Sequence, residues 1–302
     1  MRHLSIGISN NFLRLLEING SGEISFVFES DLGFTSDELF THGRRNGILA
    51  EEAGRVINAL IKEYDFYNNN ICLSIDTNQF FLSVIPIEYN ESKEAINSNI
   101  LWEISNYFPD SYKNFKINYF KLLYGTKSDS VHNTLIIAIH NKKIEVIKKI
   151  SEFCGIKFSR IDSDHFSAEK YFRKIYYETP SDNIIIVTGC KNNRIDCSVL
   201  DKRGLLHYEY ILYNGRSIND SVSVFADNIT TLRNKMDINK AFFYGDEMTT
   251  SVLKLFSEKI KDLEIKLSDP FIELPLSSDL KRNDVETEND GYKFAPLCGQ
   301  LL

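Results

Sequence analysis

The side chains best suited to chemistry stand together in one short segment, Asp162-Ser163-Asp164-His165. Two carboxyl groups and an imidazole could bind a metal ion or act as an acid–base pair. The same residues precede a run with helical periodicity, residues 164–176. Ser and Asp are also preferred at helix N-caps, where they satisfy free N–H groups. Capping is the better interpretation, and we expect Ser163 or Asp164 to begin this helix.

The other histidines and the cysteines form no recognisable site. His42, His132 and His140 have neither a histidine four residues away nor cysteine neighbours, as a metal site would require. The sequence contains no Gly-x-Ser-x-Gly motif, Cys/His pairing or Walker loop. We therefore predict no metal and no catalytic residue. The cysteines are odd in number and scattered, which is typical of buried reduced thiols: Cys72, Cys154, Cys190, Cys197 and Cys298.

The elements that would position polar residues repeat along the chain. Periodicity predicts strands at residues 4–8, 12–18 and 23–29, a helix at 51–64 and a strand at 70–75. The second half predicts strands at 183–189, 194–201 and 205–212, then a helix at 218–232, a strand at 240–244, a helix at 247–260 and a strand at 264–267. Two β-β-β-α-β-α units, the first completed by the later helix at 164–176, predict an α/β fold of duplicated actin-like (ribonuclease H-like) domains.

A segment between the two copies belongs to neither. It predicts a strand at 80–87, a helix at 90–108 that Pro109 ends, strands at 116–124 and 134–140, and a helix at 142–154 that Gly155 closes. The predicted organisation is a first actin-like domain at 1–83 and 156–180, an inserted α/β subdomain at 84–155, and a second actin-like domain at 181–302. The polar stretch 277–291 is predicted to be a loop.

Composition limits the environment and the partners. The 302 residues include 35 Lys plus Arg and 42 Asp plus Glu, a net charge of −7, which disfavours nucleic acid as a partner. No apolar run is long enough for a membrane span, and the first residues lack a signal-peptide pattern. We expect a cytoplasmic protein.

Several short motifs follow one another in a characteristic order. They are Ser5-Ile6-Gly7-Ile8-Ser9 with Arg14 and Glu17 after it, Glu103-Ile104-Ser105-Asn106-Tyr107-Phe108-Pro109, Cys154-Gly155-Ile156 with Asp162 after it, and Asp269-Pro270-Phe271. In this order and spacing, the chain resembles the PilM family of type IV pilus assembly proteins. It resembles the cell-division protein FtsA and the cytoplasmic domain of the type II secretion L protein more distantly.

The resemblance implies an ATP site between the two halves, with an Asp in each of two glycine-containing turns to position Mg²⁺. This sequence departs at both positions. Gly7 stands where the first Asp would be, Ser9 where the next Gly would be, and Val187 where the second Asp would be. The residues left for a nucleotide are Ser9, Asn10, Asn11 and Arg14 at the first turn, Gly189, Lys191 and Asn192 at the second, and Gly215, Gly245 and Asp246 on the adenosine side.

These remnants allow two interpretations. Arg14 or Lys191 could hold a phosphate, and Asp246 could contact an adenosine or repel a phosphate. Alternatively, the Asn-containing turns are ordinary hairpins, which favour Asn for its tolerance of positive φ. We expect a pseudo-ATPase with no cofactor, the alternative being a working Mg-ATP switch. Since Gly215 and Gly245 leave room for one helix, the family's extra helical wall (subdomain 2B) is expected to be reduced or absent.

The resemblance also implies a membrane-bound partner. Aromatic residues are dense around the inserted subdomain, where the family takes up the N-terminal tail of PilN in a groove against the first domain. Apolar anchors and backbone pairing at a sheet edge would hold such a peptide. The expected function is a scaffold of a type IV pilus or related secretion machine, bound with other assembly proteins at the inner membrane through a PilN-like protein.

Overall fold

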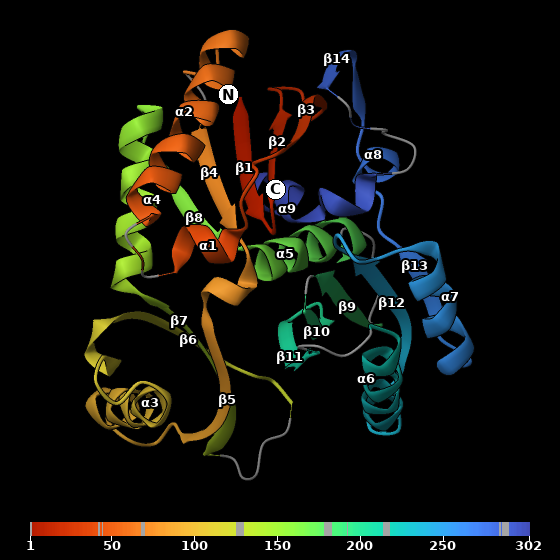
Figure 1. Ribbon diagram of the computed structural model, residues 1–302. Helices are drawn as coiled ribbons and strands as arrows, with labels where there is room; N and C mark the ends of the chain where they lie inside the picture. The colour runs from red at the N-terminus through yellow and green to blue at the C-terminus, as the bar shows by residue number, and fades with distance from the viewer. Residues whose placement is uncertain are drawn as a thin grey trace.

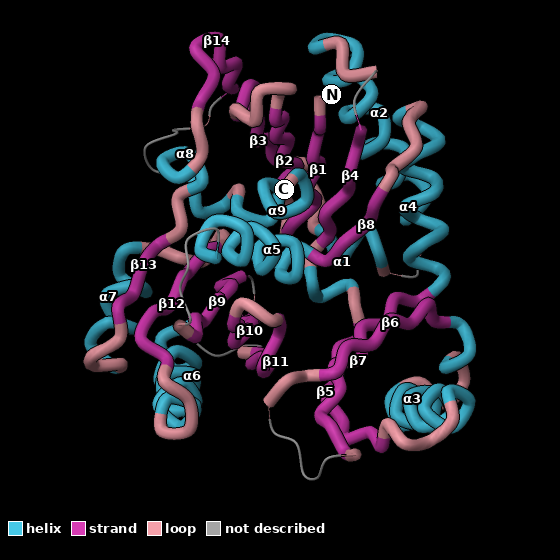
Figure 2. Tube along the Cα trace, turned by 180° about the vertical axis from the view of Figure 1, so that it is seen from behind, coloured by secondary structure: helices cyan, strands magenta, loops and turns pink. Residues whose placement is uncertain are grey.

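The computed structural model describes residues 2–41, 43, 45–67, 70–124, 130–177, 183–191, 193–213, 218–283, 285 and 290–302 (Figure 1). Within these ranges the chain forms two α/β domains and a smaller inserted subdomain. The long helix α5 (Asp164–Tyr177) lies between the two large sheets (Figure 2). No described helix is long and apolar enough to cross a membrane.

The first domain is built on a sheet of order β14-β3-β2-β1-β4-β8. Its first three strands are an antiparallel meander, and β4 and β8 continue in parallel, which requires helical crossovers. Helix α2 supplies one crossover and buries Leu49, Ile57 and Ile61 against the sheet. The elements are β1 (His3–Ser9), β2 (Phe12–Ile18), β3 (Ile24–Asp31), α1 (Ser36–Phe40), α2 (Asn46–Tyr64), β4 (Asn70–Ile75), η1 (Thr77–Gln79) and β8 (Arg160–Ser163).

The second domain repeats this topology with the order β11-β10-β9-β12-β13. The predicted duplication is therefore confirmed, and β8, which the sequence analysis did not predict, takes the place in the first sheet that β13 has in the second. Between β11 and β12 the described residues form one helix, α6, whose apolar stripe includes Val222, Phe225 and Ile229. The elements are β9 (Ile184–Lys191), β10 (Arg194–Asp201), β11 (Gly204–Leu212), α6 (Ile218–Arg233), β12 (Ile238–Tyr244), α7 (Thr250–Lys259) and β13 (Glu264–Leu267).

The inserted subdomain is a three-stranded antiparallel sheet, β5-β7-β6, covered by one helix. Helix α3 buries Ile96, Ile100 and Ile104, which recur at helical spacing as predicted. Its elements are β5 (Phe81–Glu88), α3 (Lys93–Tyr107), η2 (Tyr112–Asn114), β6 (Phe115–Lys121) and β7 (Val131–His140).

The predicted boundary at residue 155 differs from the structure. Helix α4 (Asn141–Cys154), assigned to the inserted subdomain, packs on α2 and buries Val146, Ile147 and Ile150 in the core of the first domain. The helices touch closely at Gly54, where a Cβ would lie 2.5 Å from the Phe153 Cβ. Periodicity identified the helix but not the surface that its apolar face meets.

The end of the chain returns to the first domain, although residues 181–302 were all assigned to the second. Strand β14 (Leu276–Asn283) pairs in parallel with β3, within the stretch predicted to be a loop. This exposed edge strand is polar, so it carries no hydrophobic period that the sequence could reveal. The remaining elements are α8 (Pro270–Glu273), η3 (Gly291–Lys293) and α9 (Ala295–Leu301), of which α9 packs on α5 and β1.

Candidate functional site

The β1–β2 and β9–β10 hairpins meet where the two domains face each other. Asn10 at the first turn has φ of +52° and Asn193 at the second has φ of +60°, the left-handed conformation that Asn tolerates. The Asn11 amide points to Asp31 (2.7 Å). Both Asn residues of the first turn therefore have hairpin roles. Two of the predicted nucleotide residues, Asn192 and Gly215, lie outside the described residues.

Arg14 on β2 is paired with two carboxylates. Its Nη2 lies 2.7 Å from Asp246 Oδ1 in the second domain, and its Nε donates to Glu29 Oε2 at 2.5 Å. The side chain is 4% exposed. Burial by itself would lower the Arg14 pKa, but Asp246 and Glu29 outweigh it and raise the pKa. Ser9 Oγ lies 3.5 Å from Asp246 Oδ2, so Asp246 faces the first turn from across the interface.

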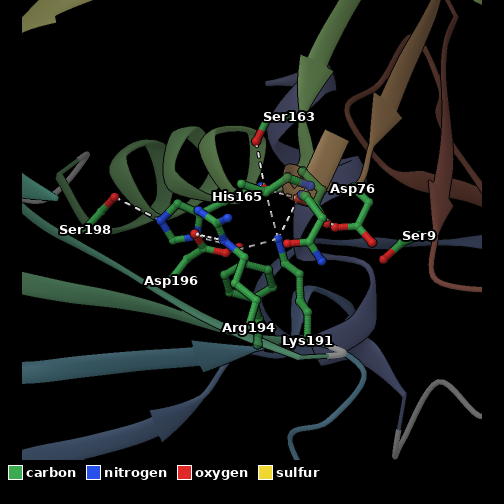
Figure 3. Close-up of polar contacts among 12 residues, drawn as sticks. Ser9, Asp76, Ser163, His165, Lys191, Arg194, Asp196 and Ser198 are labelled. Atoms are coloured by element: carbon green, nitrogen blue, oxygen red, sulfur yellow. Dashed lines mark hydrogen bonds and ion pairs between the residues drawn. The ribbon is translucent and has the colours of Figure 1, made fainter. Parts of the chain in front are cut away.

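Lys191 at the end of β9 makes the reciprocal pair. Its Nζ lies 2.5 Å from Asp164 Oδ1 in the first domain and 3.2 Å from Thr77 Oγ1. The side chains of Lys191 and Asp164 are about 4% and 5% exposed. Figure 3 shows Lys191 with Ser9 and Asp76 on one side and Asp196 and Arg194 on the other. The domains are thus joined by two ion pairs. The first domain supplies the cation of Arg14–Asp246, and the second domain supplies the cation of Lys191–Asp164.

Helix α5 begins at Asp164, directly after Ser163, as predicted, but the Asp164 carboxylate bonds to Thr77 and Lys191. Its Oδ1 accepts the Thr77 backbone N–H (2.9 Å), the Thr77 hydroxyl and the Lys191 ammonium. The Thr77 Oγ1 in turn accepts the His165 backbone N–H at the start of α5 (3.2 Å). The helix end is therefore capped from another element, and the carboxylate is used between the domains.

A second buried acid, Asp76, lies beside this pair. It follows β4, and it accepts the Asn78 backbone N–H (3.1 Å) and the Ser36 hydroxyl (3.2 Å). Burial and the nearby Asp164 raise the Asp76 pKa to about 6. The sequence reasoning missed Asp76 because it searched for acids only within the hairpins. Asp76 and Asp164 directly follow the adjacent parallel strands β4 and β8, and this pattern could have placed them together.

Behind Lys191 lies a buried polar layer contributed by both domains. His165 on α5 contacts the Tyr244 hydroxyl (2.7 Å) and Ser198 Oγ (3.0 Å), and burial lowers its pKa to about 4. Asp196 accepts from Arg194 Nε at 2.7 Å. Burial alone would raise the Asp196 pKa, but Arg194 and its neighbours lower it to about 2. Most of these polar atoms bond to one another, although Asp196 Oδ2 is buried without a hydrogen-bond partner among the described residues. The arrangement suits a structural layer between the domains.

The glycines of the site allow close packing. A Cβ on Gly245, whose φ is +110°, would lie 2.3 Å from the Cys190 carbonyl oxygen. On Gly189 it would lie 2.5 Å from the Tyr244 hydroxyl, and on Gly7 2.8 Å from Leu297 of α9. Protein atoms therefore occupy the space beside each glycine.

Little room is left between the hairpins. The cavity lined by Gly7, Ser9, Arg14, Lys191 and Asp246 holds about 20 Å³, enough for about one water molecule. Pockets for ligands of nucleotide size usually measure about 300 Å³ or more. In this arrangement the residues do not fit Mg-ATP. The described residues also contain no group of three His, Cys, Asp or Glu side chains placed to hold a metal ion.

Larger hollows lie between the first domain and the inserted subdomain. Two adjoining cavities of about 380 and 370 Å³ share Phe80, Asn118, Ile137 and Ile161, and we call them the β6–β8 groove. Strands β6 and β8 each lie at the end of a sheet. Phe120 and Ile161 remain 50% and 40% exposed there. Apolar side chains beside open strand edges suit an extended peptide.

No protein-family model matches the sequence, and no curated protein matches it. Among solved structures, a PilM-PilN type IV pilus biogenesis complex aligns with a TM-score of 0.72 and 12% identity over 98% of this chain and 96% of that chain. The chain has the fold of PilM. The resemblance seen in the sequence is thereby confirmed at the level of the fold, including its actin-like class.

Two further structures align over most of the chain. The cytoplasmic domain of EpsL, an inner membrane component of the type II secretion system of Vibrio cholerae, gives a TM-score of 0.51 and 8% identity over 99% of this chain and 94% of that chain. A Bacteroides thetaiotaomicron protein with an actin-like ATPase fold and unknown function gives a TM-score of 0.49 and 13% identity over 89% of this chain and 91% of that chain.

Proposed function

We propose that this protein is an actin-like scaffold of a type IV pilus or related secretion machine, with protein carboxylates in place of a nucleotide. The observation that carries the proposal is the pairing of Arg14 with Asp246 and of Lys191 with Asp164 across the domain interface. Each cation that could hold a phosphate is already paired with a carboxylate of the opposite domain. A nucleotide would have to displace both and open the cleft, which makes binding unfavourable.

Titration calorimetry and thermal unfolding test the nucleotide part. We expect Mg-ATP to give no saturable heat below about 1 mM and no rise in Tm, because a ligand stabilises only a state that it binds. Micromolar binding with a raised Tm would instead favour the Mg-ATP switch.

The partner part of the proposal is that the β6–β8 groove takes the N-terminal cytoplasmic tail of a PilN-like membrane protein. It is supported by the fold shared with PilM, whose structure is that of a complex with PilN. The open strand edges and the exposed Phe120 and Ile161 support it independently. The protein would then be cytoplasmic and held at the inner membrane by its partner.

A synthetic peptide with the tail sequence of a PilN-like protein encoded beside this one tests the partner. We expect saturable binding that Ile161→Asp weakens by about tenfold or more, since a charge would be buried in an apolar contact. The control is Ile48→Asp on α2, a position that is 64% exposed and outside the groove. Equal loss in both variants, or no binding by the wild type at high micromolar peptide, would contradict the groove.

A further inference from the structure

The second domain has a strand edge that the chain itself covers only in part. Strand β11 lies at the end of its sheet. The residues that follow β6 cross over from the inserted subdomain, and the N–H groups of Leu123 and Tyr124 donate to the carbonyls of Leu205 and Leu206, both at 3.1 Å. This edge therefore already accepts an extended segment at its N-terminal end. Among the described residues, no strand pairs with the outer side of residues 207–212.

A pocket of about 480 Å³ lies beside this uncovered half, where the inserted subdomain faces the second domain. We call it the β11 pocket. Its apolar lining includes Phe81, Phe108 and Phe115 of the inserted subdomain and Tyr210 and Leu212 of β11. Tyr210 is 38% exposed, Leu212 48% and Phe108 37%, so three of these side chains are only partly covered.

The charged lining of the β11 pocket has a single sign. Lys142 and Lys143 come from the first turn of α4, and Arg194 comes from the start of β10. Among the described residues that line the pocket, none is Asp or Glu. The Arg194 guanidinium lies 3.9 Å from the centre of the Tyr210 ring and is fixed by Asp196. Because Asp196 balances Arg194, the excess positive charge of the pocket comes from Lys142 and Lys143, and in a chain of net charge −7 this favours an anionic occupant.

We propose that the β11 pocket and the outer edge of residues 207–212 bind an extended acidic segment of a second protein partner, at a site that adjoins the β6–β8 groove at Phe80. The segment adds as a strand to β11 beyond Leu123 and Tyr124. Alternate side chains then enter the pocket: apolar ones pack on Phe108 and Tyr210, and carboxylates approach Lys142. Main-chain bonds supply affinity, and the pocket supplies the preference for acidic sequences.

Fluorescence anisotropy with two labelled octapeptides tests this proposal on the full chain. In one peptide every second residue is in turn phenylalanine or aspartate, with serine between them, so that both kinds share one face of the strand; in the other peptide lysine replaces aspartate. We expect the acidic peptide to bind with a Kd below about 100 µM and the basic peptide at least about tenfold more weakly. Lys142→Glu and Leu212→Asp should each weaken the acidic peptide by about tenfold.

Matched controls lie on the same elements. Lys148→Glu makes the same charge change on the exposed face of α4, and Leu267→Asp makes the same change on β13, the opposite edge of the sheet. Both should bind like the wild type, as should Ile161→Asp, which separates this site from the β6–β8 groove. No saturable binding of the acidic peptide, or equal losses in control and test variants, would overturn the proposal. Self-association in sedimentation that Lys142→Glu abolishes would assign the site to a second copy and would also overturn it.

Discussion

At the scale of residues, the interface between the domains carries two cations that each pair with a carboxylate of the opposite domain. Arg14 and Lys191 both stand at turns where a nucleotide would be expected, and both are neutralised by carboxylates of the opposite domain. A buried ion pair contributes little net stability over an apolar pair, but removing one partner leaves an uncompensated charge. By this principle the two pairs serve mainly to specify which surfaces of the two domains meet.

Lys191→Met should destabilise the protein by about 3–5 kcal/mol, because it leaves the buried Asp164 carboxyl without its cation. The double variant Lys191→Met/Asp164→Asn should recover a large part of that loss, since no unpaired charge remains. Urea unfolding at pH 7 measures both. The exposed pair Arg55–Glu51 is the control, and Arg55→Met there should cost less than about 1 kcal/mol. Similar losses at the two sites would contradict a buried interdomain pair.

Glu169 on α5 makes stability depend on pH. It is buried beside Ser198, and burial, opposed in part by Arg173, raises its pKa from an ordinary 4.5 to about 7. The folded protein thus binds a proton between these pH values that the unfolded chain has released, so this group's contribution to stability falls as pH rises from about 4.5 to about 7.

The glutamine of Glu169→Gln is neutral at every pH, so this variant should not show the loss of stability between about pH 4.5 and about pH 7. We expect the variant to match the wild type at pH 4 and to exceed it at pH 8 by up to about 3 kcal/mol in urea unfolding. Glu52→Gln at an exposed site on α2 should change stability by less than about 0.5 kcal/mol at either pH. A Glu169→Gln variant that is equally or less stable at pH 8 would refute the buried carboxyl's role.

At the scale of elements, the helix α9 depends on one glycine for its contact with α5. A Cβ on Gly299 would lie 1.7 Å from the Ser167 carbonyl oxygen, a backbone atom that cannot rotate away. The helix carries Leu297 onto Gly7 at the first hairpin, so the crossing of α9 and α5 also determines how the first turn is packed.

Gly299→Ala should therefore force the two helices apart and cost about 1–3 kcal/mol or more. Gly47→Ala in α2 makes the same change where the nearest atom is 3.7 Å away, and it should be neutral or stabilising by up to about 1 kcal/mol. Thermal unfolding of the two variants checks the contrast. A Tm for Gly299→Ala at or above that of the wild type would show that α9 is not tightly packed.

At the scale of the whole molecule, the two domains share a core around α5. One cluster of buried residues joins the first sheet, α5, the second sheet and α9, through Leu16, Tyr171, Phe172, Val187 and Leu297 among others. Because this core and the two ion pairs connect the domains, neither domain packs as a separate unit. Such continuous burial favours cooperative unfolding of the whole chain.

Scanning calorimetry should show a single transition in which the calorimetric and van't Hoff enthalpies agree. Phe172→Ala should lower the Tm of that transition without splitting it, because the lost contacts belong to both domains. Two resolved transitions in the wild type would contradict the shared core.

The amino-acid sequence by itself determined the order of most strands and helices, because hydrophobic periodicity is local and recurs in both halves, but it did not predict β8, β14, α1, α8 or α9. It also showed that the two hairpin turns lack acids. Only the tertiary structure decided that α4 belongs to the first domain, that β14 returns to the first sheet, and that Asp246 and Asp164 reach across to Arg14 and Lys191. These outcomes depend on which surfaces meet, and a one-dimensional pattern of apolar residues does not encode a partner far away in the chain.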